Sequence, residues 1–177
     1  ASPDQLKNCK ELLQNICSKS TFDGCLTFVI GENGMDLALK FGLPASQIIK
    51  TGNWLGPLLV AAAENGVKKL LLFGYHGKLV KLSGGIFHTH HHLADGRLET
   101  LTSIAVKEGI PLDLIQLISK STSVENALLI LEGRNPEAAS LIWNRMAKEI
   151  EIKSSSFVNR YLSSSMEIGS ALFDPKR

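Results

Sequence analysis

The sequence predicts an α/β fold, with a small, mainly parallel sheet of three to five strands flanked by helices and a helix-rich C-terminal half. Two β-rich stretches, 25–30 and 47–50, each lead into a glycine-containing turn and then a helical pattern, which is the order of a βαβ unit. Residues 69–73 form an unbroken apolar run of the kind buried on both faces of a parallel sheet. From Asp95 onward the pattern is mainly helical. We expect residues 1–177 to form a single α/β domain.

Helix boundaries follow from capping residues and from apolar residues at helical spacing. A capping box at Ser2, with proline in the first helical position, predicts a helix that ends near Ser18. A second capping box at Thr122 and an Asn-Pro-Glu cap at Asn135 open two later helices. Two points stay open in the tail: whether 157–162 continues the last helix, and whether 166–173 forms a final strand at a sheet edge. The helices expected between these points cover 35–41, 57–65, 95–108, 111–119 and 123–131.

Composition excludes several classes of protein. Of the 177 residues, 44% are hydrophobic and 20% are charged, which is typical of a globular chain and excludes a disordered or fibrous one. The longest stretches without a charge, 51–63 and 82–94, are shorter than the roughly 20 residues of a membrane span. Three cysteines without a CxxC pattern predict neither a disulfide framework nor a zinc site. Because the start also lacks a signal-peptide pattern, we expect a cytoplasmic protein with no membrane partner.

Positive charge is concentrated between residues 67 and 97. An anionic ligand would find its best-matched surface there. Nucleic acid is a weaker hypothesis, since the chain has two tryptophans, two tyrosines, no aromatic RNA-binding pattern and no basic helix. The window holds five basic residues, one acid and all five histidines: Lys68, Lys69, Lys78, Lys81, Arg97, Asp95, His76, His88, His90, His91 and His92.

Three glycine turns, at 31–34, 51–56 and 74–78, follow the expected strands. Open parallel sheets bind ligands at the carboxyl ends of their strands, so these turns are the place to expect a site. The turns match neither a Walker A loop nor a GxGxxG fingerprint, which disfavours nucleotide hydrolysis and dinucleotide binding. If the histidine run is extended, His88, His90 and His92 point the same way and could face a metal ion. Closely spaced ligands rarely complete a tetrahedral site, so polar or ligand-binding histidines are the other interpretation.

A long, ordered set of motifs then identifies a family. The chain carries GNWLG at 52–56, KKLLLFG at 68–74, GKLVKL at 77–82, GIFHTH at 85–90 and ADGR at 94–97, followed by Glu99. These motifs closely resemble the cobalt-precorrin-5B C1-methyltransferase family of oxygen-independent cobalamin synthesis. The match is ungapped from Gly52 to Glu99, and looser similarity extends from about residue 2 to residue 173.

The chain departs from the family pattern in two ways. Tyr75 stands where the family usually has histidine, with His76 one position later, and His88 and His91 replace an asparagine and a serine. Family members also carry an N-terminal half, beginning with a motif rich in Gly, Thr and Ala, to which nothing here corresponds. The chain therefore resembles the C-terminal domain alone, and the missing N-terminal domain is an expected partner.

The resemblance implies methyl transfer from S-adenosylmethionine to C1 of a cobalt-bearing tetrapyrrole, whose cobalt arrives with the substrate rather than at a metal site of the protein. Lys78, Lys81, Arg97 and His88 are the implied contacts to the acidic substrate, and His90 or Asp95 would accept a proton. The implied cofactor contacts are Gly31, Gly34, Gly52, Asn53, Gly56, Gly74 and Gly77.

Each of these roles has a structural alternative. The glycines serve tight turns in that alternative, and Asp95 and Asn53 cap helices. For the whole chain, the alternative is a non-catalytic tetrapyrrole- or metal-binding module that uses the histidine-rich segment. A homo-oligomer is compatible with either function.

Overall fold

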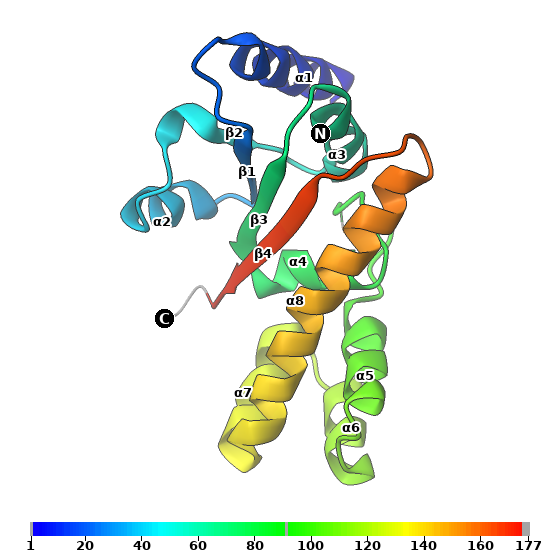
Figure 1. Ribbon diagram of the computed structural model, residues 1–177. Coiled ribbons are helices and arrows are strands. Elements are labelled where there is room, and N and C mark those ends of the chain that lie inside the picture. The colour runs from blue at the N-terminus through cyan, green and yellow to red at the C-terminus, as the bar shows by residue number, and fades with distance from the viewer. Residues whose placement is uncertain (1, 91, 175–177) are drawn as a thin grey trace.

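The computed structural model describes residues 2–90 and 92–174, and its centre is a parallel sheet in the strand order β2-β1-β3-β4 (Figure 1). The strands are β1 (Cys25–Ile30), β2 (Ile48–Lys50), β3 (Lys69–Tyr75) and β4 (Glu167–Phe173). In register, Phe28 of β1 lies opposite Leu72 of β3, and Leu72 lies opposite Ser170 of β4. The parallel sheet is confirmed, and the tail does form a last strand at its edge.

Helices make up most of the remaining chain, and every α-helix of the described residues except α4 corresponds to a predicted one. Ser2 caps the first helix by accepting a hydrogen bond from the Gln5 amide, as predicted, and the last helix extends to Asn159, into the stretch left open. The helices are α1 (Pro3–Ser18), α2 (Gly34–Lys40), α3 (Leu55–Glu64), α4 (His76–Ser83), α5 (Arg97–Lys107), α6 (Leu112–Ser119), α7 (Val124–Arg134) and α8 (Pro136–Asn159), with a short 3-10 turn at Ala45–Gln47.

The third glycine turn was predicted wrongly. β3 runs through Gly74 to Tyr75, and α4 begins at the next residue, so 74–78 is the end of a strand and the start of a helix. Gly74 allows the two central strands to approach, because a Cβ there would lie 2.7 Å from the Ile30 carbonyl oxygen. A Cβ on Gly77 would collide with the Tyr75 ring. Both glycines therefore reflect close packing rather than a flexible loop.

Several helix starts also differ from the prediction; α5, for example, begins at Arg97 rather than at Asp95. α3 begins at Leu55, two residues earlier than expected, which places Gly56 inside the helix. α7 is capped by Ser123 rather than Thr122: the Ser123 hydroxyl accepts a 3.0 Å hydrogen bond from the Asn126 amide. Serine and threonine are both favoured at the N-cap, and the capping-box pattern at Thr122 competes here with the adjacent serine, which is the stronger cap of the two.

The two faces of the sheet are covered unequally. Alternate strand residues such as Phe28 and Leu72 belong to the main core, which they share with α1, α3, α4 and α8; we call this the covered face. The residues between them, including Val29 and Phe73, form a small second core with Ala38 of α2; we call this the open face. Figure 1 shows α2 on one side of the sheet and α3 and α8 on the other.

Beyond the sheet, α5, α6, α7 and the first half of α8 form a helical lobe, at the bottom of Figure 1. The main core continues into this lobe through buried residues such as Leu101, Leu128 and Ile142. Within residues 2–90 and 92–174, no helix combines the length and apolar character that a membrane crossing needs.

Candidate functional site

The strand order places a topological switch point between β1 and β3, because the chain leaves β1 for β2 on one side and reaches β3 on the other. The carboxyl ends of these two strands bring Gly31, Tyr75 and Lys78 together. A Cβ built on Gly31 would lie 3.8 Å from Cγ of Lys78 and 4.0 Å from Cδ1 of Tyr75. Two of the predicted site residues, Gly31 and Lys78, are therefore neighbours at the place where such sheets bind ligands.

The turn after β2 is bonded to the histidine-rich segment. The Thr89 hydroxyl lies 2.8 Å from Oδ1 of Asn53, and the Thr89 amide donates to the Asn53 carbonyl at 3.4 Å. Next to this pair, the Gly56 amide donates to the Phe87 carbonyl at 3.0 Å. Thr89 is only 1% exposed, and its part in joining the two motifs was missed in the sequence because only the fold brings residues 36 positions apart together.

Two of the histidines have neighbours that restrict their rings. His88 packs edge-on against Trp54, with 5.1 Å between ring centroids, so it lies against the turn after β2. The His90 ring lies 5.1 Å from that of His92, and Nδ1 of His90 accepts a hydrogen bond from the His92 amide at 3.3 Å. Among the described residues, no group of three His, Cys, Asp or Glu side chains could hold a metal ion. The described side chains therefore do not form the metal-binding face that was one of the two interpretations of the histidine run; His91 lies outside the described residues.

Lys81 holds the same segment from the opposite side. Its side chain is 1% exposed, and its Nζ donates to the carbonyls of Thr89 at 3.1 Å and Ala94 at 2.7 Å. Burial lowers the pKa of this amine, and the nearby positive charge of Arg97 lowers it further. Lys81 thus restrains the loop between residues 89 and 94. Its predicted contact with the substrate stays a prediction, which this burial disfavours.

Asp95 and Arg97 form a two-point ion pair at the start of α5. Nε of Arg97 lies 2.6 Å from Oδ1 of Asp95, and Nη2 lies 3.2 Å from Oδ2. Oδ1 also accepts the backbone amide of Arg97 at 3.3 Å, although the N-cap position of α5 is occupied by Gly96 rather than by Asp95. The hydrogen bonds from Arg97 lower the pKa of Asp95, and the same pairing raises the pKa of Arg97. A guanidinium has five N–H donors, so Arg97 keeps donors that Asp95 does not engage.

Three of the predicted substrate-binding cations lie close enough to interact electrostatically. Besides burial, the charges of Arg97 and Lys78 both lower the pKa of Lys81. We call Lys78, Lys81 and Arg97 the cationic edge. Lys68 and Lys69 do not belong to it, because they lie at the amino end of β3.

Most of the glycines predicted to contact a cofactor are accounted for by packing. A Cβ would lie 2.6 Å from Cγ1 of Val29 at Gly34, and 3.0 Å from the Phe157 ring at Gly56. Gly52 has a φ of +57° and turns the chain against Gln5. Gly74 and Gly77 are also explained by packing, as described above. Of the six glycines predicted to contact a cofactor, this leaves Gly31 (φ +95°), where an added Cβ would meet only ordinary contacts. Packing thus accounts for most of these glycines, and their contact with a cofactor stays a prediction.

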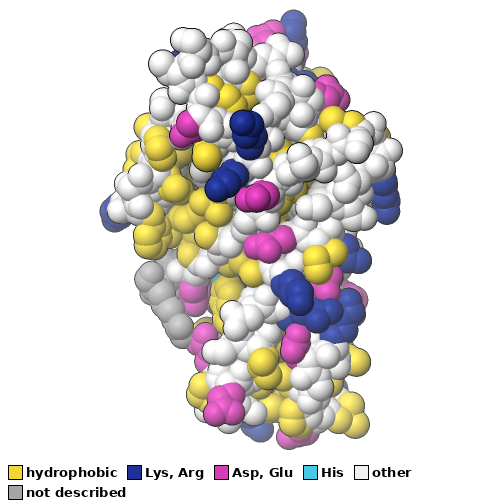
Figure 2. Space-filling model, in the orientation of Figure 1, with side chains coloured by type: hydrophobic (Ala, Val, Ile, Leu, Met, Phe, Trp, Pro, Cys, Tyr) yellow, Lys and Arg dark blue, Asp and Glu magenta, His cyan; other side chains and the backbone are white. Residues whose placement is uncertain are grey.

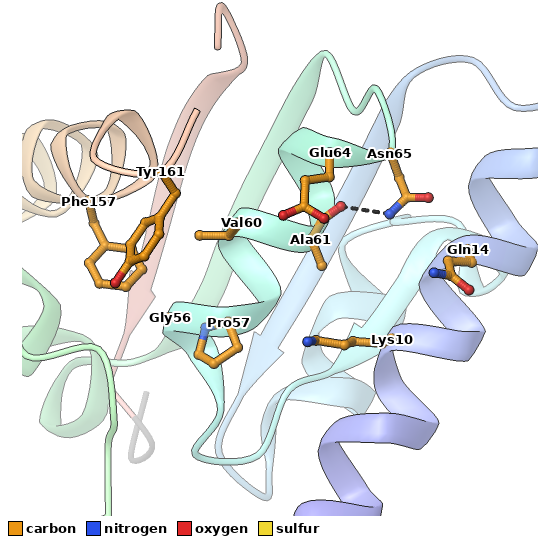
Figure 3. Close-up of a pocket in the computed structure, with 10 residues that line it drawn as sticks. All are labelled: Lys10, Gln14, Gly56, Pro57, Val60, Ala61, Glu64, Asn65, Phe157 and Tyr161. Atoms are coloured by element: carbon orange, nitrogen blue, oxygen red, sulfur yellow. Dashed lines mark hydrogen bonds between the residues drawn. The ribbon is translucent and has the colours of Figure 1, made fainter. Parts of the chain in front are cut away.

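A separate pocket of about 380 Å³ lies between α1, α3 and the end of α8 (Figure 3). Lys10 and Gln14 approach from α1, while Phe157 and Tyr161 approach from the other side, with Pro57 and Val60 of α3 between them. No residue of the cationic edge lines it. The pocket shares Gly56 with the predicted site but is otherwise distinct from it.

Comparisons with known proteins agree on one family. The family model "CbiD, C-terminal domain" matches residues 88–177. Cobalt-precorrin-5B C(1)-methyltransferases of Prochlorococcus marinus are similar over the whole chain: the protein of strain NATL1A is 83% identical, that of strain NATL2A is 84% identical, and that of strain MIT 9313 is 56% identical. The chain spans only 46% of the length of each of these relatives.

No solved structure matches the chain. The family match nonetheless covers half of it, including the histidine-rich segment, the Asp95–Arg97 pair and the whole helical lobe. The resemblance seen in the motifs from Gly52 to Glu99 is thus confirmed independently. The chain belongs to the CbiD family and carries its C-terminal domain.

Proposed function

We propose that this chain is the tetrapyrrole-binding half of an S-adenosylmethionine-dependent methyltransferase that methylates C1 of cobalt-precorrin-5B in cytoplasmic cobalamin synthesis. The product would be cobalt-precorrin-6A, with S-adenosylhomocysteine released. The names of the relatives support the reaction, and their greater length supports a division of the enzyme into two parts. Because one core runs from the sheet into the helical lobe, we treat residues 1–177 as one of these parts.

The observation that carries the proposal is the cationic edge beside the β1–β3 switch point. A cobalt tetrapyrrole of this pathway carries acetate and propionate groups around its ring, so its site must supply cations. Lys78 reaches the switch point next to Gly31, and Arg97 is held in a fixed orientation by Asp95. A guanidinium whose orientation is fixed before binding loses less side-chain entropy when it meets a carboxylate.

Besides cations that bind the acidic substrate, the methyl transfer requires a group that accepts a proton. The methyl–sulfur bond breaks with its electron pair leaving on sulfur, the new carbon–carbon bond forms from the electrons of the ring, and the ring then loses a proton. Asp95 is a poor acceptor, since its hydrogen bonds from Arg97 lower its pKa. We therefore favour His90, whose Nδ1 would release the His92 amide to take the proton.

We place the methyl donor largely outside this half. Gly34, Gly56, Gly74 and Gly77 lie against protein atoms, which leaves little backbone exposed for a nucleoside to approach. Gly31 and Asn53 would then line only one wall of the cofactor pocket. The donor and the ring carbon must meet in line, so such a pocket would open toward the cationic edge.

The test is an absorbance titration of the chain with cobalt-uroporphyrin, a stable cobalt tetrapyrrole that carries acetate and propionate groups. Lys78→Met is expected to weaken binding about tenfold, the equivalent of about 1.4 kcal/mol, because it removes one charge-assisted contact. Lys120→Met is the matched control, since Lys120 is an exposed lysine that follows α6 in the helical lobe. Equal affinities of the two variants would contradict the proposed site.

Two further titrations separate the alternatives. Calorimetry with S-adenosylhomocysteine is expected to show no binding to this chain alone; micromolar binding would place the cofactor pocket here instead. Tight one-to-one binding of zinc by the tetrapyrrole-free chain would favour a metal-binding module over an enzyme part.

A further inference from the structure

The open face of the sheet is unusual for parallel strands. Parallel sheets are normally covered on both faces, because crossover helices bury them from either side. Here the covered face packs against four helices, whereas the open face has α2, which is seven residues long. α2 covers the carboxyl halves of the strands through Ala38, which packs with Val29 and Phe73. The amino halves lie beyond it.

A hollow of about 430 Å³ lies over these amino halves, and its lining is mainly apolar. Leu71 of β3 and Gly169 of β4 line it from the sheet, while Leu43 and Pro44 line it from the segment after α2. Figure 2 shows hydrophobic side chains gathered over α2 and the adjoining sheet, at the left of the molecule. The exposed charges of Lys69 and Glu167 stand at its edge.

An aromatic row continues this surface toward the carboxyl end of the sheet. Phe73 lies between Phe173, with ring centroids 5.4 Å apart, and Phe41, at 6.1 Å. Phe41 is nevertheless 70% exposed, and Leu39 beside it is 44% exposed. An apolar surface with a charged rim is the usual composition of a stable protein interface.

The length of the relatives indicates what covers this surface. The chain matches 46% of each, so more than half of each relative lies outside the match. A segment of that length belongs to each of these two relatives, and its docking would complete the burial of the central strand β3. We propose that the hollow and the aromatic row, from Leu43 and Leu71 to Phe41 and Phe173, form the surface on which the N-terminal half of the full-length enzyme packs.

The inference rests on the proposed division of the enzyme into two halves, but it does not depend on the methyl-transfer chemistry. A second copy of this chain is the rival occupant. The rival surface is the pocket between α1, α3 and α8, which is lined by Lys10, Glu64 and Gln14 beside its aromatic side chains and is the more polar of the two. An obligate domain contact is expected to use the more apolar surface.

The experiment is co-expression of this chain, carrying an affinity tag, with the part of the strain NATL1A relative that lies outside the match. Three aspartate variants of similarly exposed side chains are compared: Phe41→Asp on the open face, Tyr161→Asp at the rival pocket and Leu112→Asp on α6, with exposed fractions of 70%, 66% and 68%. Because all three side chains are mainly in solvent, each variant is expected to fold, which circular dichroism checks.

Support for the proposal is one-to-one co-purification with the wild-type chain, a loss of affinity of at least about tenfold for Phe41→Asp, and unchanged affinity for the other two variants. Slower amide exchange at residues 167–173 in the complex is expected as well. The proposal is overturned if the wild-type chain captures nothing, if Tyr161→Asp weakens capture more than Phe41→Asp does, or if Phe41→Asp instead dissociates a dimer of this chain. Association is measured here without substrate, so failure of the proposed methyl transfer would leave the result intact.

Discussion

The two faces of the sheet differ in how completely helices cover them. The covered face packs against α1, α3, α4 and α8 and shares a core with the helical lobe, so its residues in β1 and β3, such as Phe28 and Leu72, are buried. The open face has one short helix and leaves Leu71, Ala171 and Phe173 half-buried. The candidate site depends on the covered face, because α4 carries both Lys78 and Lys81. Stability and site geometry thus come from one face, which leaves the other available for association.

Adjacent leucines in β3 provide the largest test of this difference. Leu72→Ala is expected to lower the free energy of unfolding by about 3–4 kcal/mol, since Leu72 is fully buried on the covered face and truncation leaves a cavity. Leu71→Ala, on the open face, is expected to cost about 1 kcal/mol, because part of its side chain is already hydrated. Urea unfolding followed by circular dichroism measures both. Equal losses would show that the two faces contribute alike.

The fold could be predicted from local patterns, and the unequal faces could not. Apolar runs at 25–30 and 69–73 mark buried strands, and capping residues such as Ser2 mark helix starts. The glycines at 74 and 77 were misinterpreted as a turn, because a glycine required by close packing has the same sequence signal as one required by a turn. Which helix covers which face depends on chain direction in space, which no single window contains.

The sequence predicted which residues lie at the candidate site better than it predicted what each of these residues does there. The family motifs contain Asn53, Lys81 and Arg97, yet a motif does not distinguish a side chain that binds a ligand from one that supports its neighbours. The structure pairs Asn53 with Thr89 and Lys81 with two backbone carbonyls, contacts that span 36, 8 and 13 residues. Such partners become visible only when the fold is known.

Two lysines one turn apart in α4 allow a similar comparison within the candidate site. Lys81→Met is expected to destabilise the protein by about 1–2 kcal/mol, because the buried carbonyl of Thr89 and the carbonyl of the exposed Ala94 lose their donor. Proteolysis between residues 87 and 95 is expected to become faster as the loop is released. Lys78→Met, the matched control, is expected to change stability by less than about 0.5 kcal/mol while weakening tetrapyrrole binding. A Lys81 variant that keeps full stability and an unchanged loop would show that Lys81 is not a structural restraint.

The smallest expected effect concerns pH and tests whether the covered face excludes water. His76, at the start of α4, is 1% exposed and packs edge-on against Trp143 of α8, with ring centroids 5.2 Å apart. Burial lowers its pKa, an effect that the negative charges of Asp174, Glu125 and Glu132 only partly oppose. As the pH falls below about 6.5, the unfolded chain takes up a proton at this histidine before the folded chain does. The free energy of unfolding therefore decreases with acidification until the pH passes the folded-state pKa.

His76→Gln is expected to remove this part of the pH dependence, since glutamine does not titrate. His92→Gln, at an exposed position of the histidine-rich segment, is the control and should keep it. The measurement is the urea midpoint of the wild-type chain and both variants between pH 7.5 and 5. If the wild-type midpoint falls on acidification and that of His76→Gln falls less, the covered face keeps His76 neutral in the folded state. Parallel curves for all three proteins would mean that His76 takes up a proton equally well in the folded and the unfolded chain. The covered face would then not exclude water at the carboxyl end of the sheet, where the candidate site lies.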